Sequence, residues 1–213
     1  NKKKKKKILA LILARKNSKR LPGKNLRKIG NKSLVEWSID SIKNIDGIID
    51  VLVSSDDKRI INIAKKKGSL APFVRPKRIS KDNTSSEETS MHAINWYEKN
   101  VTKLDGFFLL QPTTPFRSRA KLKKAILIFN KNDSKPILSV SKFLNDKKRD
   151  KSKINGSFYL SSIKYFKKYK KLSPKKFYPI EIKAKYQCLD IDTIDDFNLA
   201  KKYYKKIIKF MKI

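Results

Sequence analysis

Two acidic residues near the end of the chain could bind a metal ion. In Asp190-Ile191-Asp192 the two aspartates stand two positions apart. On an extended segment this spacing directs both carboxylates to one face, while Ile191 faces the core. Two hard oxygen ligands so placed suit Mg²⁺ bound to substrate phosphates. The alternative is that Asp192 only caps a following helix, a role that Thr193 could equally take.

A basic loop could hold the phosphates themselves. Residues 15–25 contain Arg15, a Pro22-Gly23 turn and Lys24. The N–H groups of a turn, together with two cations, can bind a triphosphate through charge-assisted hydrogen bonds. The G-x-x-x-x-G-K-[ST] spacing of a Walker A loop is absent. Residue chemistry alone therefore favours phosphate binding only modestly over a merely basic loop.

Two further polar segments are suited to a ligand. Gln111 begins a stretch with two prolines, QPTTPFR at residues 111–117, which would present an amide and hydroxyls to a polyhydroxylated ligand. Arg75 and the polar stretch 80–86 lead into a helix N-terminus, where backbone donors favour an anion or a base edge. A tight structural turn and a plain helix cap explain these two segments equally well.

Apolar runs and helical periodicities predict the elements that would position these residues. Strands are expected at 8–14, 48–55, 107–110, near 136–140, near 157–160, and ending near Asp192. Helices are expected from Ser33, at 58–67, 85–99, near 119–130, and at 193–211. This alternation predicts an α/β fold of three layers, with a mostly parallel, doubly wound, Rossmann-like sheet. In such a sheet, ligands bind beyond the carboxyl ends of the strands.

Length and charge narrow the class of protein. The 213 residues suit a single domain, 1–213, with a lysine-rich, solvated tail at 1–7. The net charge of +35 by itself favours nucleic acid or an acidic membrane surface. The basic residues are spread along the whole chain without a recognisable nucleic-acid-binding signature, so a general lysine bias explains them better. We therefore expect no specific nucleic acid and no membrane among the partners.

Rare residue types give two further expectations. Cys188 is the only cysteine, which excludes an intramolecular disulfide, and the longest apolar run, 8–14, is too short to span a bilayer. These features predict a cytoplasmic protein. His92 is the only histidine, lies in a predicted helix, and is expected to be a packing residue rather than a catalyst.

Together these segments resemble the acylneuraminate cytidylyltransferases, which are the CMP-sialic acid synthetases and their relatives acting on legionaminic or similar sugars. The most specific part is ILARKNSKRLPGKN at 12–25, which is similar to the nucleotide loop of that family. The other similar segments are VSSDD at 53–57, RP at 75–76, D-x-x-S-S at 82–86, LLQPTTPFR at 109–117, NGSFYL at 155–160 and DIDT at 190–193. The CMP-Kdo synthetases rank lower, because their glutamine segment usually reads differently.

The resemblance implies a nucleotide-diphosphosugar transferase-like fold and a homodimer that uses CTP and Mg²⁺. The substrate would be a nonulosonic acid, either N-acetylneuraminate or a related sugar such as legionaminate. Its anomeric hydroxyl would attack the α-phosphorus of CTP and expel pyrophosphate. For the nucleotide, the resemblance implies contacts with Arg15, Lys24, Asn25, Arg75, Thr84 and Ser86. For the sugar, it implies contacts with Gln111, Lys153 and Asn155. It implies catalytic roles for Arg15, Lys24, Asp190 and Asp192, of which Asp190 and Asp192 would bind Mg²⁺.

The chain departs from the family pattern at residues 141–154, where relatives usually carry a longer segment that helps to pair subunits and to approach the sugar. Lys153 replaces the arginine expected near the sugar carboxylate, which keeps the charge but loses the bidentate geometry. Two alternatives stay open. One is a homologue that binds CTP but has lost turnover, and the other is a basic nucleic-acid-binding protein built on a similar domain.

Overall fold

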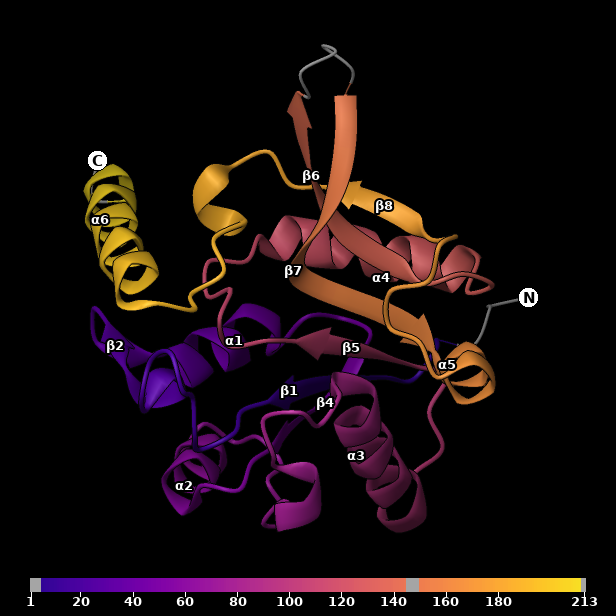
Figure 1. Ribbon diagram of the computed structural model, residues 1–213. Coiled ribbons are helices and arrows are strands. Elements are labelled where there is room, and N and C mark those ends of the chain that lie inside the picture. Colours follow the sequence, from indigo (N-terminus) through magenta and orange to yellow (C-terminus); the bar gives the residue numbers. More distant parts are fainter. Residues whose placement is uncertain (1–4, 145–149, 212–213) are drawn as a thin grey trace.

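A six-stranded mixed sheet forms the centre of the molecule (Figure 1). The computed structural model describes residues 5–144 and 150–211. The strand order is β4-β1-β5-β7-β6-β8, and only β7 runs antiparallel to its neighbours. The strands are β1 (Ile8–Leu13), β4 (Ile48–Ser54), β5 (Gly106–Leu110), β6 (Ile137–Leu144), β7 (Asp150–Ser162) and β8 (Tyr178–Glu181). The predicted α/β class with a mostly parallel sheet is confirmed.

Helices cover both faces of this sheet. One face carries α1 (Leu34–Ile42), α2 (Lys58–Lys66) and α4 (Arg119–Lys131), and the other carries α3 (Ser86–Asn100) and α5 (Ile163–Tyr169). Strand β1 alternates between the two cores, because Ala10 and Ile12 pack towards α1 while Leu9 and Leu11 pack towards α3. All four side chains are fully buried, as a central strand covered on both sides requires.

The predicted helix starts are also present. Ser33 and Glu36 form a reciprocal capping box at the start of α1. At the start of α3 the Ser85 hydroxyl accepts a hydrogen bond of 3.0 Å from the Glu88 N–H. These caps fix the direction in which each helix leaves the carboxyl edge of the sheet.

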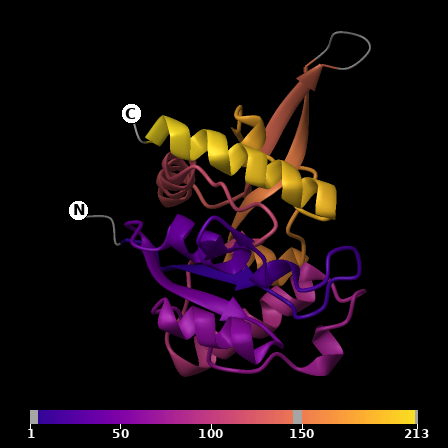
Figure 2. The ribbon, with the colours of Figure 1, turned by 90° about the vertical axis from the view of Figure 1, so that its left-hand side faces the viewer.

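The last helix, α6 (Ile194–Met211), packs against a two-stranded hairpin formed by β2 (Lys28–Ile29) and β3 (Lys32–Ser33). It lies at one end of the molecule in Figure 1 and crosses the face turned to the viewer in Figure 2. A third apolar cluster joins Phe197 of α6 to Leu21 and Ile29. None of the helices in residues 5–144 and 150–211 is both long and apolar enough to cross a bilayer.

One predicted element at the C-terminal side was wrong. Within the described residues no strand ends at Asp192, because the last strand is β8 and residues 190–193 have no regular structure. In the segment 141–154, for which no element was predicted, residues 141–144 and 150–154 continue β6 and β7 as a hairpin that projects from the sheet (Figure 1). Residues 145–149 of this segment lie outside the described residues.

Part of the lysine-rich tail also departs from the expectation of a solvated terminus. The Lys6 ammonium lies 3.0 Å from the Asp133 carboxylate and 3.0 Å from the Phe129 carbonyl. The Lys7 N–H donates to Asp105 at 2.7 Å. Residues 5–7 are therefore tied to the domain, while residues 1–4 lie outside the described part of the chain.

Candidate active site

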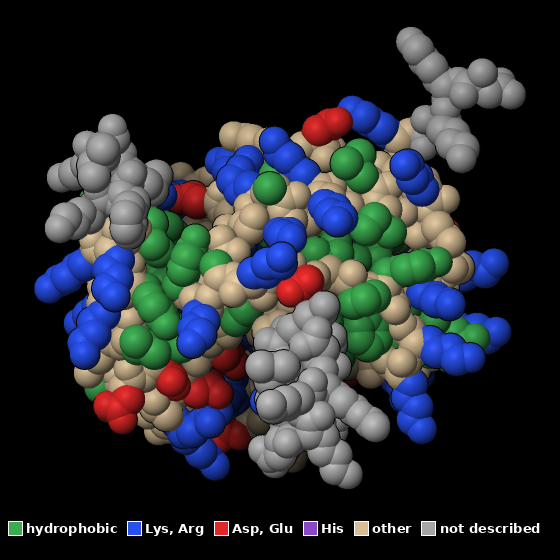
Figure 3. Space-filling view, turned by 90° about the horizontal axis from the view of Figure 1, so that it is seen from above, with side chains coloured by type: hydrophobic (Ala, Val, Ile, Leu, Met, Phe, Trp, Pro, Cys, Tyr) green, Lys and Arg blue, Asp and Glu red, His purple; other side chains and the backbone are tan. Residues whose placement is uncertain are grey.

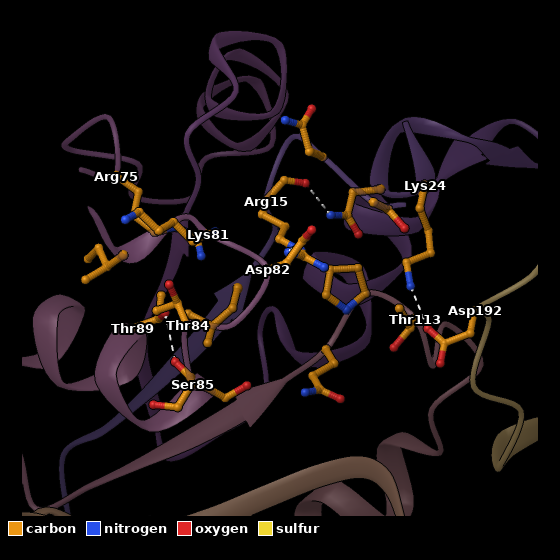
Figure 4. Close-up of a pocket in the computed structure, with 18 of the residues that line it drawn as sticks. Arg15, Lys24, Arg75, Lys81, Asp82, Thr84, Ser85, Thr89, Thr113 and Asp192 are labelled. Carbon is orange, nitrogen blue, oxygen red and sulfur yellow. Dashed lines mark hydrogen bonds and ion pairs between the residues drawn. The ribbon is translucent and has the colours of Figure 1, made fainter. Parts of the chain in front are cut away.

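The segments that follow three neighbouring strands meet at one cavity. Leu13 of β1 is in register with Ser54 of β4, and Ile12 with Leu110 of β5, so the chain leaves all three strands at the same edge. A cavity of about 340 Å³ lies there (Figure 4). Its lining includes Arg15, Asn17, Ser18, Lys24, Asn25, Arg75, Lys81, Asp82, Thr84, Ser85, Ser86, Thr89, Gln111, Thr113, Asp190 and Asp192.

A tight turn presents Lys24 to this cavity. The Lys24 N–H donates to the Leu21 carbonyl at 3.1 Å, and Gly23 has φ +65°. Proline followed by a positive-φ glycine is the combination that a type II turn requires. The turn therefore follows from the sequence Pro22-Gly23, and the short 3₁₀ helix η1 (Lys24–Leu26) continues from it.

Two hydrogen bonds anchor the rest of this loop. Asn25 is 7% exposed, and its amide donates to the Arg15 carbonyl at 2.9 Å. The Lys16 N–H donates to the Asp56 carboxylate at 2.7 Å. Asn25 therefore lines the cavity but also holds the backbone from which the Arg15 side chain extends.

The Arg15 guanidinium is paired with Asp82 across the cavity (Figure 4). Lys19 approaches the other oxygen of the same carboxylate at 3.0 Å. The hydrogen bond from Lys19 and the charge of Arg15 lower the pKa of Asp82. Sequence reasoning gave Asp82 no role, although it stands inside the D-x-x-S-S segment, and a carboxylate facing a basic loop was the signal that could have found it.

Arg75 is a buried cation in the wall of the cavity. It is 5% exposed, and its guanidinium donates to the Ser54 carbonyl at 2.8 Å. Burial lowers the pKa of Arg75 to about 10, with Arg15 adding to the shift and Asp56 opposing it, so the group is protonated at neutral pH. Its Nε–H is buried and has no hydrogen-bond partner among the described residues.

A second buried arginine organises the loop that begins at Gln111. Arg117 is 8% exposed and donates to the Ser157 carbonyl at 2.5 Å, to the Ser38 hydroxyl at 2.9 Å and to the Gln111 carbonyl. Burial lowers the pKa of Arg117 to about 9, and the nearby Asp190 charge opposes that shift. Arg117 thus joins α1, β7 and the Gln111 loop, a role that was not predicted from the sequence.

The two aspartates lie at the cavity as their spacing predicted. Ile191 is fully buried, and its N–H donates to the Thr113 carbonyl at 2.8 Å, while both carboxylates line the cavity. Asp192 pairs with Lys24 at 2.8 Å and with Arg20 at 2.6 Å. The helix cap is supplied by Thr193, whose hydroxyl accepts from the Asp196 N–H at 3.2 Å, so Asp192 does not act as the cap.

The donor set fits Mg²⁺ held jointly with a phosphorylated ligand. In residues 5–144 and 150–211 no group of three or more His, Cys, Asp or Glu side chains could hold a metal ion alone. Mg²⁺ is usually bound by one or two carboxylates together with substrate phosphates and water. Asp190 and Asp192 supply two such carboxylates beside the cations.

Two of the predicted sugar residues lie outside this lining. Lys153 is exposed on β7, opposite Ser141. The Asn155 amide contacts the Cys188 thiol at 3.4 Å. The other predicted site residues, Arg15, Lys24, Asn25, Arg75, Thr84, Ser86, Gln111, Asp190 and Asp192, all line the cavity.

A cation-rich cavity at the carboxyl edge of a mostly parallel sheet is typical of nucleotide-binding α/β enzymes. The sequence profile of the cytidylyltransferases matches residues 9–205. The chain therefore belongs to the cytidylyltransferase family, and the resemblance found in the sequence is confirmed at that level.

Similar proteins span nearly the whole chain. The chain is 33% identical to the pseudaminic acid cytidylyltransferase of Campylobacter jejuni, over 93% of this chain and 97% of the relative. It is 28% identical to the CMP-N,N'-diacetyllegionaminic acid synthase of Legionella pneumophila, over 92% and 95%. A CMP:2-keto-3-deoxy-manno-octonic acid synthetase solved with CTP has a TM-score of 0.75 at 16% identity, over 94% and 99%, which is a likeness of fold.

Proposed function

We propose that this cytidylyltransferase transfers CMP from CTP to a nonulosonic acid and releases pyrophosphate. The observation that carries the proposal is the single cavity in which Arg15, Lys24 and Arg75 face Gln111 and the two aspartates. The relatives named for pseudaminic and N,N'-diacetyllegionaminic acid support this class of sugar. The individual sugar would be decided by residues around Gln111.

The nucleotide would occupy the side of the cavity formed by the loop after β1 and the start of α3. Arg15 and Lys24 are placed to bind the phosphates, since charge-assisted hydrogen bonds to phosphate oxygens are strong. Arg75, Thr84 and Ser86, which line this side of the cavity, would contact the nucleoside. Binding would replace Asp82 and Asp192 as the partners of Arg15 and Lys24.

In the reaction, the anomeric oxygen of the sugar forms a bond to the α-phosphorus, and the bond from that phosphorus to the bridging oxygen of the β-phosphate breaks. The hydroxyl proton leaves to solvent or to a base, and pyrophosphate departs with its negative charge. Arg15 and Lys24 would stabilise that charge, because fixed cations aimed at developing charge lower the barrier.

Asp190 and Asp192 would hold Mg²⁺ beside the α-phosphate. When bound, the ion supplies neutralisation of charge on the reacting phosphates. The hydrogen bond from the Ile191 N–H to the Thr113 carbonyl fixes the backbone between the two carboxylates. Their spacing is therefore set before any ligand arrives.

Several predicted features stay predictions. Contacts of Lys153 and Asn155 with the sugar are not supported by the lining of this cavity. A homodimer, a cytoplasmic location and the absence of a specific nucleic-acid partner rest on sequence reasoning alone. Gln111 lines the cavity next to Thr113 and is the best-placed residue for a sugar hydroxyl.

The test is pyrophosphate release with CTP, Mg²⁺ and a panel of pseudaminate, legionaminate, N-acetylneuraminate and Kdo. The Asp192→Asn variant should lower kcat by about 100-fold or more, because one Mg²⁺ ligand is lost. The matched control is Asp195→Asn, which removes the same charge from an exposed position in the first turn of α6 and should keep kcat within about twofold.

The outcomes separate the alternatives. Pyrophosphate release with one of the nine-carbon sugar acids, if it is lost in Asp192→Asn and kept in Asp195→Asn, supports the proposal and identifies the sugar. Binding of CTP without release for any sugar supports the homologue that has lost turnover. Absence of CTP binding together with tight, selective binding of an oligonucleotide would overturn the proposal in favour of a nucleic-acid-binding protein.

A further inference from the structure

We propose that Arg27 is a positioning residue that holds the Lys24 turn against helix α6, and so keeps Lys24 aimed at the phosphates while CTP is bound. Arg27 does not line the cavity. The proposal rests on the proposed function, since it assigns Lys24 to the CTP phosphates. Arg27 acts on the side of the turn that faces away from the ligand.

Arg27 closes the turn through two hydrogen bonds. Its Nε–H donates to the Pro22 carbonyl at 3.1 Å, and its backbone N–H donates to the Lys24 carbonyl at 3.1 Å. The turn between them holds Gly23 at φ +65°, a residue with no side chain to restrain it. The Arg27 side chain therefore supplies a restraint that glycine itself cannot provide.

The same side chain joins the turn to α6. The Arg27 guanidinium lies over the Phe197 ring, 5.8 Å from its centroid, which is within range of a cation–π interaction. Phe197 is 3% exposed and packs with Leu21, the residue just before the turn. The Phe197 N–H donates to the Thr193 carbonyl at 3.1 Å, so the ring has a fixed place relative to Asp192.

Two links thus connect the turn to the segment that carries the aspartates. On the cavity side the link is the Lys24–Asp192 ion pair of 2.8 Å, and behind the cavity it is Arg27 on Phe197. A triphosphate competes with Asp192 for Lys24, which weakens the first link when the ligand arrives. The second link does not involve any group that binds ligand, so it keeps the turn in place in the bound state.

The geometry requires arginine at this position. A guanidinium can donate from Nε while its flat face lies on an aromatic ring, whereas a lysine ammonium is a point charge at the end of a flexible chain. Arg27→Lys keeps the charge but cannot make both contacts together. If Arg27 contributed only its charge, Arg27→Lys would preserve CTP binding. If Arg27 positions the turn, Arg27→Lys would weaken it.

The experiment measures CTP binding in the presence of Mg²⁺ by titration calorimetry, without sugar. Arg27→Met and Arg27→Lys should each weaken CTP binding about 10-fold. The matched control is Arg78→Met, which removes the same charge from a side chain that is 72% exposed and pairs only loosely with Glu88, at 3.5 Å. It should bind CTP within about twofold of the wild type, and all variants should keep the wild-type circular dichroism spectrum.

A double-mutant cycle with Lys24→Met separates positioning from general destabilisation. If Arg27 acts through Lys24, Arg27→Met should cause no more than about a twofold further loss in the Lys24→Met background, because coupled residues are non-additive. Additive losses, or wild-type affinity in both Arg27 variants, would overturn the proposal. A wild-type protein that binds no CTP would contradict the proposed function itself, and the assignment of Arg27 would fall with it.

Discussion

Individual carboxylates stand where a nucleotide would have to bind. Asp82 pairs with Arg15 and Lys19, and Asp192 pairs with Lys24 and Arg20. Arg15 and Lys24, which would bind phosphate, are thus paired with carboxylates of the protein before any ligand arrives. On the function proposed above, CTP would displace these carboxylates, so its net affinity would be the difference between two sets of ion pairs. Before the ligand binds, the ion pairs with Asp82 and Asp192 also hold the basic side chains near the positions in which they are needed.

The buried guanidinium of Arg117 should be important for stability. Arg117→Met removes the guanidinium donor from the Ser157 carbonyl in a buried site and leaves the Gln111 carbonyl with only the Thr114 N–H. We expect a loss of about 2–4 kcal/mol in the free energy of unfolding, measured by urea denaturation. Arg119→Met is a control on the neighbouring helix, where an exposed guanidinium reaches the carbonyls at the end of α1, and should cost about 1 kcal/mol. Equal losses in the two variants would contradict this role.

Residue chemistry predicted the site only where side-chain spacing decides the geometry. The pair Asp190 and Asp192 was recognised because alternate residues share a face of an extended chain. Arg117 was quoted in a segment but was given no role, because its partners lie up to 79 positions away. Contacts between residues so far apart in the sequence depend on the fold and cannot be recognised from the spacing of neighbouring residues.

At the scale of elements, helix α6 depends on a glycine in the β2–β3 hairpin. Gly30 has φ +64°, and a Cβ placed there would overlap the hydroxyl end of Tyr204 on α6. Gly23 has nearly the same φ, +65°, but nothing lies within 4 Å of a Cβ there. An alanine would therefore be conformationally strained at either position, but only at Gly30 would it also clash with a neighbouring side chain.

We expect Gly23→Ala to lower the free energy of unfolding by about 1–2 kcal/mol through strain alone. Gly30→Ala should cost at least about 1 kcal/mol more, since the packed Tyr204 side chain must shift, alone or with the helix. The measurement is urea unfolding of both variants and of Gly30→Ala with Tyr204→Ala. The extra cost should shrink in the double variant, whereas equal costs for the two glycine variants would show that Tyr204 can move away freely.

Most elements could be predicted because their signals are local. Capping residues at Ser33 and Ser85 and the apolar run at 8–14 predicted α1, α3 and β1 to within one or two residues. Helix α5 and strand β8 were missed, because short elements have weak periodicity. The strand expected before Asp192 was wrong, since an extended backbone there hydrogen-bonds to Thr113 of a loop rather than to a strand.

For the molecule as a whole, the net charge is +35, and on the face seen in Figure 3 it is not gathered into a single basic stripe. On the face seen in Figure 3 the Lys and Arg side chains are scattered, with acidic and apolar groups between them. Nucleic-acid-binding surfaces usually gather such charges on one face or along one helix. Weak, salt-sensitive attraction to polyanions follows from any charge of this size, whatever the enzyme acts on.

Global stability should depend on pH through the only histidine. Burial, followed by the charges of Arg78 and Arg75, lowers the pKa of His92 below its usual value of 6.5. The unfolded chain therefore takes up a proton more readily than the folded one. The contribution of His92 is fully present above about pH 6.5 and is lost as the pH falls towards the lower pKa of the folded state.

The free energy of unfolding, measured by urea denaturation at each pH, should therefore decrease as the pH is lowered from about 7.5 to about 5.5. The pKa values of Asp40 and Asp57 are shifted downward by hydrogen bonds and by neighbouring cations, so these carboxylates titrate below this window. In His92→Gln the decrease should disappear. A wild-type profile that is flat over this range, or a variant with the same slope as the wild type, would contradict the assignment.

The ion pair between Lys24 and Asp192 joins residues 168 positions apart. During translation the Lys24 turn leaves the ribosome long before its acidic partner exists, with a delay of roughly 10 to 30 seconds at ordinary elongation rates. Throughout that interval the nascent chain has the basic loop but lacks Asp190 and Asp192. On the function proposed above, CTP and Mg²⁺ would together stabilise only a chain whose C-terminal segment has been made, so the nucleotide would act as a late ligand that favours completed molecules over truncated ones.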